Sequence, residues 1–400
     1  MLAHRDARLL LAGQTLSVFG DRAMFLALGV WVKTLTGSSA AAGLVFFAYT
    51  APGLVSPLFG VVVDRARARP LMIGLNLAGA AVLIPLIGVH GRGQLWLIYL
   101  VALLYGAIGW LFYSAQSAYL TRLLPPELLG DANAALQTTG EGMRLFAPLV
   151  GAALFAAFGG PTVAALDAAT FVVAAATLWL VHHRERRPAP SEHHLRAQVA
   201  AGARHIARSE GLRRIVAATA ACLLVVGFSE TLIFSVIQHG LHRPPTFFGV
   251  LSTAQGGGAI AGGLVAGTAL RRHGDGRVMG IGMLLFAVGE AGLLVPHTAV
   301  VLAGFAVAGT GIALAVVGYF TAVQLRTPAD LQGRVNAAAD MLVGVPQTVS
   351  IALGAALVGI VDYRLLIAVM SVVTAGCGVY LLTAHLPPPT DGLVPAGDAR

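Results

Sequence analysis

Charged residues are scarce in this sequence. They make up 11% of the 400 residues, against about 25% in an ordinary soluble domain. Apolar residues make up 57%, so a globular protein of this composition would have too little polar surface to be wetted. Lysine is almost absent, because Lys33 is the only one in the chain. A Walker phosphate loop, which ends in Gly-Lys-Ser or Gly-Lys-Thr, is therefore excluded.

Sequence motifs of enzymes and metal sites are also missing. There is no His-Glu-x-x-His, no Gly-x-Ser-x-Gly and no spacing of Cys and His typical of metal ligands. The cysteines Cys222 and Cys377 lie in apolar stretches and predict no disulfide framework. The glycines from Gly256 to Gly263 lie inside an apolar run with no preceding strand, so we interpret them as helix-packing residues. We therefore expect no enzyme, no metal and no cofactor.

Long apolar runs occupy the chain from Leu9 to Leu382. Each is about 20 residues long, the length that a helix needs to cross a bilayer core of about 30 Å. The first continues well past 20 residues without a small-residue cleavage site, so we interpret it as a span and not as a signal peptide. We expect an all-α polytopic membrane protein with twelve transmembrane helices. The expected spans are residues 9–33, 38–63, 70–89, 94–120, 132–158, 161–182, 213–238, 246–270, 277–296, 299–324, 334–360 and 363–383.

Basic residues are distributed unevenly between the expected loops. With the amino terminus inside, two arginines fall within helices, Arg22 and Arg144, and nearly all the other basic residues fall on inner loops and tails. The basic residues on the outer side are Lys33, Arg92, Arg243 and Arg364. This is the positive-inside pattern, and it predicts that both termini are cytoplasmic. The net charge of +8 is then a topological signal, and we expect no nucleic-acid partner.

The chain resembles itself at an offset of 203 residues. The aligned pairs are Pro125 with Pro328, Asn133 with Asn336, Gly151 with Gly354, Gly60 with Gly263, and Arg69 with Arg272. We expect two pseudo-symmetric six-helix halves, residues 1–182 and 213–385, and a flexible cytoplasmic tail at 386–400. The cytoplasmic linker at 183–212 resumes an amphipathic pattern at Leu195. That segment lies along the membrane surface or forms a solvated helix.

A short turn between the second and third spans carries an acid and several arginines. Gly60 and Asp64 stand near the end of the second span, and Arg65, Arg67 and Arg69 follow. A carboxylate there can face the positive end of a neighbouring helix or pair with arginines, and a rocking motion would break either contact. We predict a conformational gate at Gly60, Asp64, Arg65 and Arg69, although the arginines alone are explained by topology.

This turn resembles the major facilitator superfamily, in which a Gly-x-x-x-Asp-Arg pattern follows the second helix. The order of three further segments is similar to that of bacterial drug and siderophore exporters, including macrolide efflux proteins. The segments are Thr36–Ser39, Gly130–Ala134 and Gly249–Gly258. The resemblance implies that the two halves surround a central cavity lined by spans one, four, seven and ten, with span five beside it. It also implies export as the direction of transport.

Span five carries a second point of resemblance. Ala147–Ala152 is similar to the Gly-Pro-x-x-Gly-Gly motif of the family's antiporters. Pro148 removes a backbone donor, and Gly151 allows another helix to approach closely. We therefore predict a helix bend or sliding contact at Pro148 and Gly151.

Several charged residues lie well inside the expected spans. Each would cost about 3 kcal/mol if it faced lipid, so they face each other or water. The expected coupling and cavity residues are Asp21, Arg22, Tyr113, Gln116, Glu141, Arg144 and Glu230.

These charges have alternative explanations. Glu141 and Arg144, three positions apart, are either a neutralised structural pair or cavity residues. Glu230 has no basic residue nearby in its helix, so we favour Glu230 and Asp21 as acids that bind and release a proton. Glu290 is expected to be paired or interfacial, and Asp340 to serve in the gate or in coupling.

The sequence thus predicts a multi-pass protein of the bacterial cytoplasmic (inner) membrane. We expect a monomeric, proton-coupled exporter of small organic compounds that works by alternating access. The partners are then a small-molecule substrate, protons and the lipid bilayer. A passive facilitator or siderophore exporter of the same fold and, less favoured, a transport-dead receptor are the alternatives.

Overall fold

The computed structural model describes residues 5–56, 59, 62–63, 66–123, 126–181, 195–328 and 331–384, and all regular structure in them is helical. The first half contains α1 (Arg5–Thr36), α2 (Ser39–Thr50), α4 (Ala68–Leu83), α5 (Leu95–Leu123), α6 (Pro126–Phe158) and α7 (Gly160–Trp179). The second contains α8 (Leu195–Arg208), α9 (Glu210–Val226), α10 (Ser229–Ser235), α11 (Phe248–His273), α12 (Asp275–Ala291), α13 (Thr298–Leu325), α14 (Gln332–Leu357) and α15 (Tyr363–Thr383). Short 3₁₀ segments are η1 (Ala51–Val55), η2 (Ile84–Gly88), η3 (Arg92–Gln94), η5 (Pro245–Phe247) and η6 (Gly292–Leu294), and η4 (Val236–Gly240) is a π-helix.

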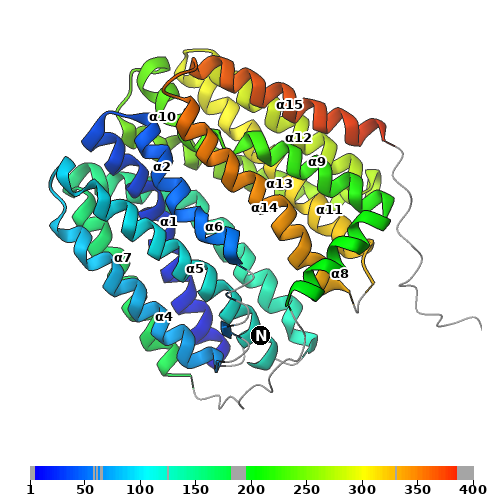
Figure 1. The fold of residues 1–400 in the computed structure, drawn as a ribbon, viewed down its shortest axis with the longest axis horizontal. Coiled ribbons are helices and arrows are strands. Elements are labelled where there is room, and N and C mark those ends of the chain that lie inside the picture. Colours follow the sequence, from blue (N-terminus) through cyan, green and yellow to red (C-terminus); the bar gives the residue numbers. More distant parts are fainter. Residues whose placement is uncertain are drawn as a thin grey trace, which may run out of the picture.

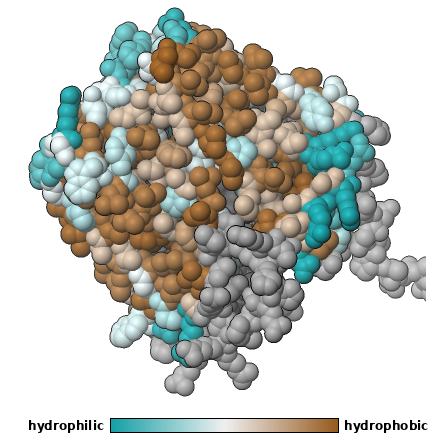
Figure 2. All heavy atoms as spheres, in the orientation of Figure 1, coloured by the Kyte–Doolittle hydropathy of each residue, from teal (hydrophilic) through white to brown (hydrophobic). Residues whose placement is uncertain are grey.

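The described part of the chain contains nine helices that are long and apolar enough to cross a membrane. The helices α2, α6 and α11 complete the set, so the expected twelve crossing segments are confirmed. Hydrophobic residues cover much of the surface that Figure 2 shows, and hydrophilic residues gather at its margins. This is the surface expected of a protein whose middle lies in lipid.

The helices form two groups that follow the sequence. In Figure 1, α1 to α7 lie on one side and α8 to α15 on the other. The groups meet where α2 touches α10 and α14, and where α6 touches α11. We call the end at which α1 starts and α15 ends the termini end, and the opposite end, with the α1–α2 turn at Gly37, the far end.

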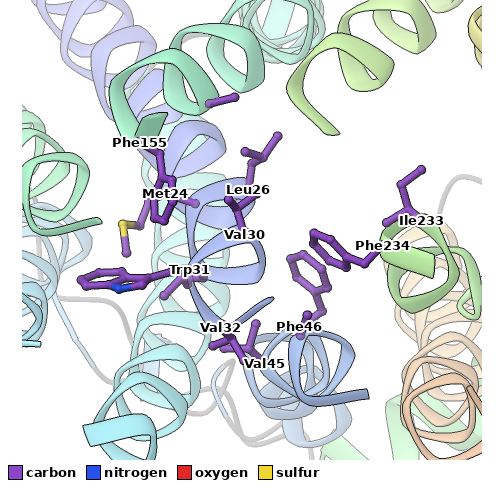
Figure 3. Packing of buried hydrophobic residues seen from close by; sticks show 14 of the residues in the cluster. Met24, Leu26, Val30, Trp31, Val32, Val45, Phe46, Phe155, Ile233 and Phe234 are labelled. Atoms are coloured by element: carbon purple, nitrogen blue, oxygen red, sulfur yellow. The ribbon is translucent and has the colours of Figure 1, made fainter. Parts of the chain in front are cut away.

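One buried hydrophobic cluster joins both halves at the far end. It combines residues of α1, α2 and α7 with residues of α10, α11 and α15. The rings of Phe46 (α2) and Phe234 (α10) stack across the boundary with centroids 6.1 Å apart (Figure 3). Within the first half, Trp31 meets Phe155 edge to face at 6.3 Å.

Polar contacts reinforce this closure. Lys33 is only 4% exposed, and its Nζ donates to Gly37 O and to Ser39 Oγ, each at 2.9 Å. Ser235 of α10 donates to the same Ser39 hydroxyl at 3.1 Å. The end of α1, the start of α2 and α10 are thus linked by one chain of hydrogen bonds.

The termini end is organised differently, because its buried clusters, as far as the described residues form them, do not cross between the halves. One contains Val63, Met72, Tyr119 and other first-half residues. The other contains only second-half residues from Ile206 to Leu381. The halves therefore share a hydrophobic core at the far end, whereas each has its own core at the termini end.

The amphipathic segment after the linker forms α8, which docks on α14. A Cβ at Gly202 would lie 2.0 Å from Arg334 O, so the two helices approach closely. Ile206 joins the second-half cluster at the termini end. The apolar face of α8 is thus covered by protein.

Closure of the far end depends on a glycine. A Cβ added at Gly43 of α2 would lie 1.9 Å from Thr231 Oγ1 and 2.8 Å from Thr231 Cβ on α10. Gly43→Ala should therefore weaken contact between the halves at this end. In a background without Cys222 and Cys377, maleimide should label Ile237→Cys faster when Gly43→Ala is present, because Ile237 is buried in the hydrophobic cluster that joins the halves.

Gly74→Ala is the matched control, since a Cβ there meets nothing within 4 Å. Equal labelling rates in the Gly43→Ala and Gly74→Ala backgrounds would contradict this account of the closure.

Candidate functional site

A tyrosine joins two carboxyl groups about halfway along α1. The hydroxyl of Tyr105 on α5 lies 2.5 Å from Asp21 Oδ1 and 2.7 Å from Asp167 Oδ2 on α7. Thr170, one turn after Asp167, donates to its own helix backbone at Asp167 O and lies 3.1 Å from Asp167 Oδ1. Three helices of the first half therefore converge on one polar cluster, which we call the Asp–Tyr–Asp cluster.

Asp167 was not among the predicted residues. It is 0% exposed, and the signal that could have found it is the one that pointed to Asp21, an acid in the middle of an apolar run. Its approach to α1 depends on Gly20. A Cβ there would lie 2.2 Å from Asp167 Oδ1 and 2.5 Å from Thr170 Oγ1.

Arg22 follows Asp21 directly and points elsewhere. Its side chain is exposed, whereas Asp21 is partly buried. This agrees with helix geometry, in which adjacent residues lie about 100° apart. Arg22 still acts electrostatically on Asp21 and on Tyr49 of α2.

The predicted cavity residues of α5 have different environments. Tyr113 is 67% exposed, whereas Gln116 is 8% exposed and its amide nitrogen has no hydrogen-bond partner in the described structure. Asp340 of α14 is exposed and close enough to act electrostatically on Tyr113 and on Tyr319 of α13. Side chains of spans four, ten and eleven thus face a common region nearer the termini end.

Glu230 lies immediately after a break in the seventh span. The helix α9 ends at Val226, and α10 starts at Ser229. Glu230 is half-buried and acts electrostatically on Glu290 of α12, which is 3% exposed. Glu290 Oε2 has no hydrogen-bond partner among the described residues. The second half therefore also brings two carboxyl groups together.

Pro148 lies inside α6, which continues through it. A Cβ at Gly151 would lie 2.8 Å from Ala23 Cα on α1, and one at Gly249 of α11 would lie 2.8 Å from Pro148 O. The Pro148–Gly151 segment therefore lies close both to α1 of its own half and to α11 of the other half. Glu141 and Arg144 lie on the same helix, but their side chains lie outside the described structure.

Most of the predicted gate lies outside the described residues, namely Gly60, Asp64 and Arg65. Arg69 is described. Its guanidinium donates to Leu178 O at 2.9 Å and to Trp179 O at 2.7 Å. Arg69 therefore caps the last carbonyls of α7 and holds the start of α4 against it.

The corresponding turn of the second half contains a charge pair that the sequence did not reveal. Asp275, the first residue of α12, forms a two-pronged ion pair with Arg326, which follows α13. The Arg326 carbonyl also meets the ring of His205 on α8 at 3.2 Å. This pair fastens α8, α12 and α13 together at the termini end.

These features are those of a multi-pass membrane transporter built from two helical halves. The chain belongs to the Major Facilitator Superfamily, which matches residues 10–237 and 219–399. It is similar to the uncharacterized MFS-type transporter YfiS of Bacillus subtilis, with 23% identity over 82% of this chain and 80% of that protein. Macrolide efflux protein A of Streptococcus pyogenes is 27% identical over 42% of this chain and 43% of that protein.

Solved structures share the fold at low identity. A bacterial homologue of the iron transporter ferroportin, in its inward-facing state, aligns with a TM-score of 0.74 at 16% identity, covering 94% of this chain and 98% of the other. The nucleoside transporter NupG aligns with a TM-score of 0.73 at 14% identity, covering 96% and 100%. The relatives and solved structures named here are transporters, as expected for a chain that is not an enzyme.

The ion pair at the start of α12 yields a test of stability. Asp275 and Arg326 are 11% and 6% exposed, and loss of one partner of a buried pair costs about 3–5 kcal/mol. Asp275→Asn should therefore lower the free energy of unfolding of the purified protein by about 3 kcal/mol or more.

Glu210→Gln is the comparison, because the Glu210–Arg214 pair is exposed and such pairs contribute about 1 kcal/mol or less. Denaturation in detergent compares the two variants. If Asp275→Asn is no less stable than Glu210→Gln, the pair does not hold the termini end together.

Proposed function

We propose that this chain is a secondary active transporter that exports small organic compounds in exchange for protons. The observation that carries the proposal is the shared hydrophobic core at the far end and the separate cores at the termini end. Two halves joined in this way can rock about a central site, opening one end as the other closes. The closed far end corresponds to a conformation that is open toward the termini.

The orientation follows from the basic residues. Arginines at or beside the helix ends gather at the termini end, among them Arg67, Arg69, Arg271, Arg272 and Arg334. By the positive-inside rule this end is cytoplasmic. The protein then resides in the bacterial inner membrane as a monomer, with residues 1–182 and 213–385 as its moving halves, and the described conformation faces inward.

Proton coupling is supported by the acids inside the bundle. Asp21 and Glu230 each lie on the first span of their half, near a second buried acid. An acid in an apolar region binds a proton when its surroundings are dry and releases it when water enters. Asp21, Arg22, Glu141, Arg144 and Glu230 are the proposed coupling residues.

Export of a small organic compound is favoured by the relative named macrolide efflux protein A. Tyr113 and Gln116 are the proposed cavity residues on α5, while Asp340 joins Gly60, Asp64, Arg65 and Arg69 in the proposed gate. A passive facilitator or a siderophore exporter would have the same fold, and a receptor would move nothing. A susceptibility panel in a pump-depleted bacterial host expressing this chain identifies the compound class to use in vesicles.

Coupling is tested in proteoliposomes with a compound from that panel. A pH gradient should accelerate transport by the wild type, and Asp21→Asn or Glu230→Gln should abolish the acceleration because an amide cannot exchange the proton. Substrate binding should persist in part.

Asp362→Asn is the control, since Asp362 caps the start of α15 and lies apart from the acid pairs. A wild-type rate that is the same with and without the gradient rules out coupling. Unchanged pumping in both acid variants removes these residues from the mechanism.

The gate is tested by exchange kinetics. Asp64→Asn should slow interconversion between the inward-facing and outward-facing states, because the state that the Asp64 contact stabilises is re-formed less readily without that contact. Donor and acceptor dyes on Arg92 and His297, replaced by cysteines in a cysteine-free background, would report the exchange by single-molecule energy transfer. Exchange at the wild-type rate in Asp64→Asn would contradict the assignment of Asp64 to the gate.

A further inference from the structure

If both carboxyl groups of the Asp–Tyr–Asp cluster were ionised, the cluster would hold one hydrogen too few for its two short contacts. Two short oxygen contacts, at 2.5 and 2.7 Å, each require a hydrogen between the two atoms. Tyr105 has one hydroxyl hydrogen, and an ionised carboxylate is only an acceptor. One of the two carboxyl groups must therefore supply the second hydrogen, so at least one of Asp21 and Asp167 is protonated.

The charges lead independently to the same result. The groups that face or act on the pair are Arg22 of α1, Tyr49 of α2, Tyr105 of α5 and Thr170 of α7, and α6 approaches α1 here through Gly151. Arg22 is the one cation among these groups in the part of the chain whose side chains the structure describes. Two carboxylates beside one arginine leave an excess negative charge in a buried region, which is strongly disfavoured. One bound proton makes the cluster neutral.

The two acids differ in their access to water. Asp21 is partly exposed, whereas Asp167 is 0% exposed. A proton on Asp167 can reach Asp21 through the tyrosine. The O–H bond of Asp167 breaks as the Tyr105 oxygen gains that hydrogen, and the original Tyr105 O–H breaks as Asp21 gains the other. Tyr105 is neutral before and after, and the proton leaves to water from Asp21.

We propose that Asp21, Tyr105 and Asp167 form a single-proton site within the first half, in which Asp167 holds the proton, Tyr105 relays it and Asp21 exchanges it. The inference rests on the proposed proton coupling and adds Asp167 and Tyr105 to its machinery. It also gives α5 and α7 a role, because separation of either helix from α1 would break the relay.

Infrared difference spectroscopy of the purified full-length protein without substrate tests the site. Among the protonated-carboxyl bands of the wild type, one should be lost in Asp167→Asn. The same single band should be lost in Asp21→Asn, and the double variant should lose no more. This lack of additivity is the signature of a shared proton, and Asp21→Asn reports on it if Asp167→Asn does not fold.

Two losses that add in the double variant, or no loss in either single variant, would overturn the site. Asp362→Asn should leave this band unchanged.

For Tyr105→Phe, gradient-driven transport should fall to the level of Asp21→Asn. Tyr99→Phe should transport normally, since it removes a hydroxyl of the same helix that donates only to Ala41 O at 3.1 Å. Transport by Tyr105→Phe at the Tyr99→Phe level would contradict the relay.

The inference and the proposed function fail in different ways. If wild-type transport ignores a pH gradient, proton coupling is wrong, whatever the spectra show. If a pH gradient accelerates transport but the band is absent, or its losses add in the double variant, proton coupling is supported and the shared-proton site is wrong.

Discussion

The Tyr105 hydroxyl between Asp21 and Asp167 is the contact on which the first half depends. A carboxylate inside a bilayer-spanning bundle must be neutralised or hydrogen-bonded, because neither lipid nor the apolar core solvates it. Here three helices meet to satisfy that requirement. Tyr105 also contacts Tyr49 and Phe171 through its ring, with centroids 5.6 and 5.8 Å away, so the polar contact is fixed by its apolar surroundings.

The same constraint connects the site to motion between the halves. Ala23, two residues after Asp21, is where α6 approaches α1 through Gly151, and the neighbouring carbonyl of Pro148 faces α11 of the other half. In the proposed rocking motion, a shift of α11 against α6 would take place close to Asp21 on α1. Because Phe46, Phe234 and the Lys33 network hold the halves together at the far end, such a shift would accompany opening there. In the proposed function, the protonation state of the first half biases that opening.

The sequence was sufficient for the architecture, because membrane crossing imposes length and hydropathy on each span. Twelve segments and the family could be read from it, and Asp21 and Glu230 could be proposed because charges in apolar runs are conspicuous. The pairing of these acids with Asp167 and Glu290 could not be predicted. It depends on which helices pack behind spans one and seven, and on the space left by Gly20.

The break at Gly227–Phe228 and the ion pair between Asp275 and Arg326 were unpredictable for a related reason. Both arise from contacts between segments far apart in the chain, and neither leaves a periodic signal. Continuous hydropathy across residues 213–238 hides the break, which is a local feature of backbone packing. At the repeat offset of 203 residues, Asp64 aligns with Gly267. The acid of the corresponding second-half turn is Asp275, the first residue of α12.

In the proposed function, this one protein exchanges substrate for protons across the membrane. The most direct test records the internal pH of proteoliposomes while a substrate gradient, with no initial pH gradient, drives downhill substrate flux. The account predicts that protons move in the opposite direction to the substrate and build a pH difference that a protonophore collapses. Substrate flux at constant internal pH would contradict it.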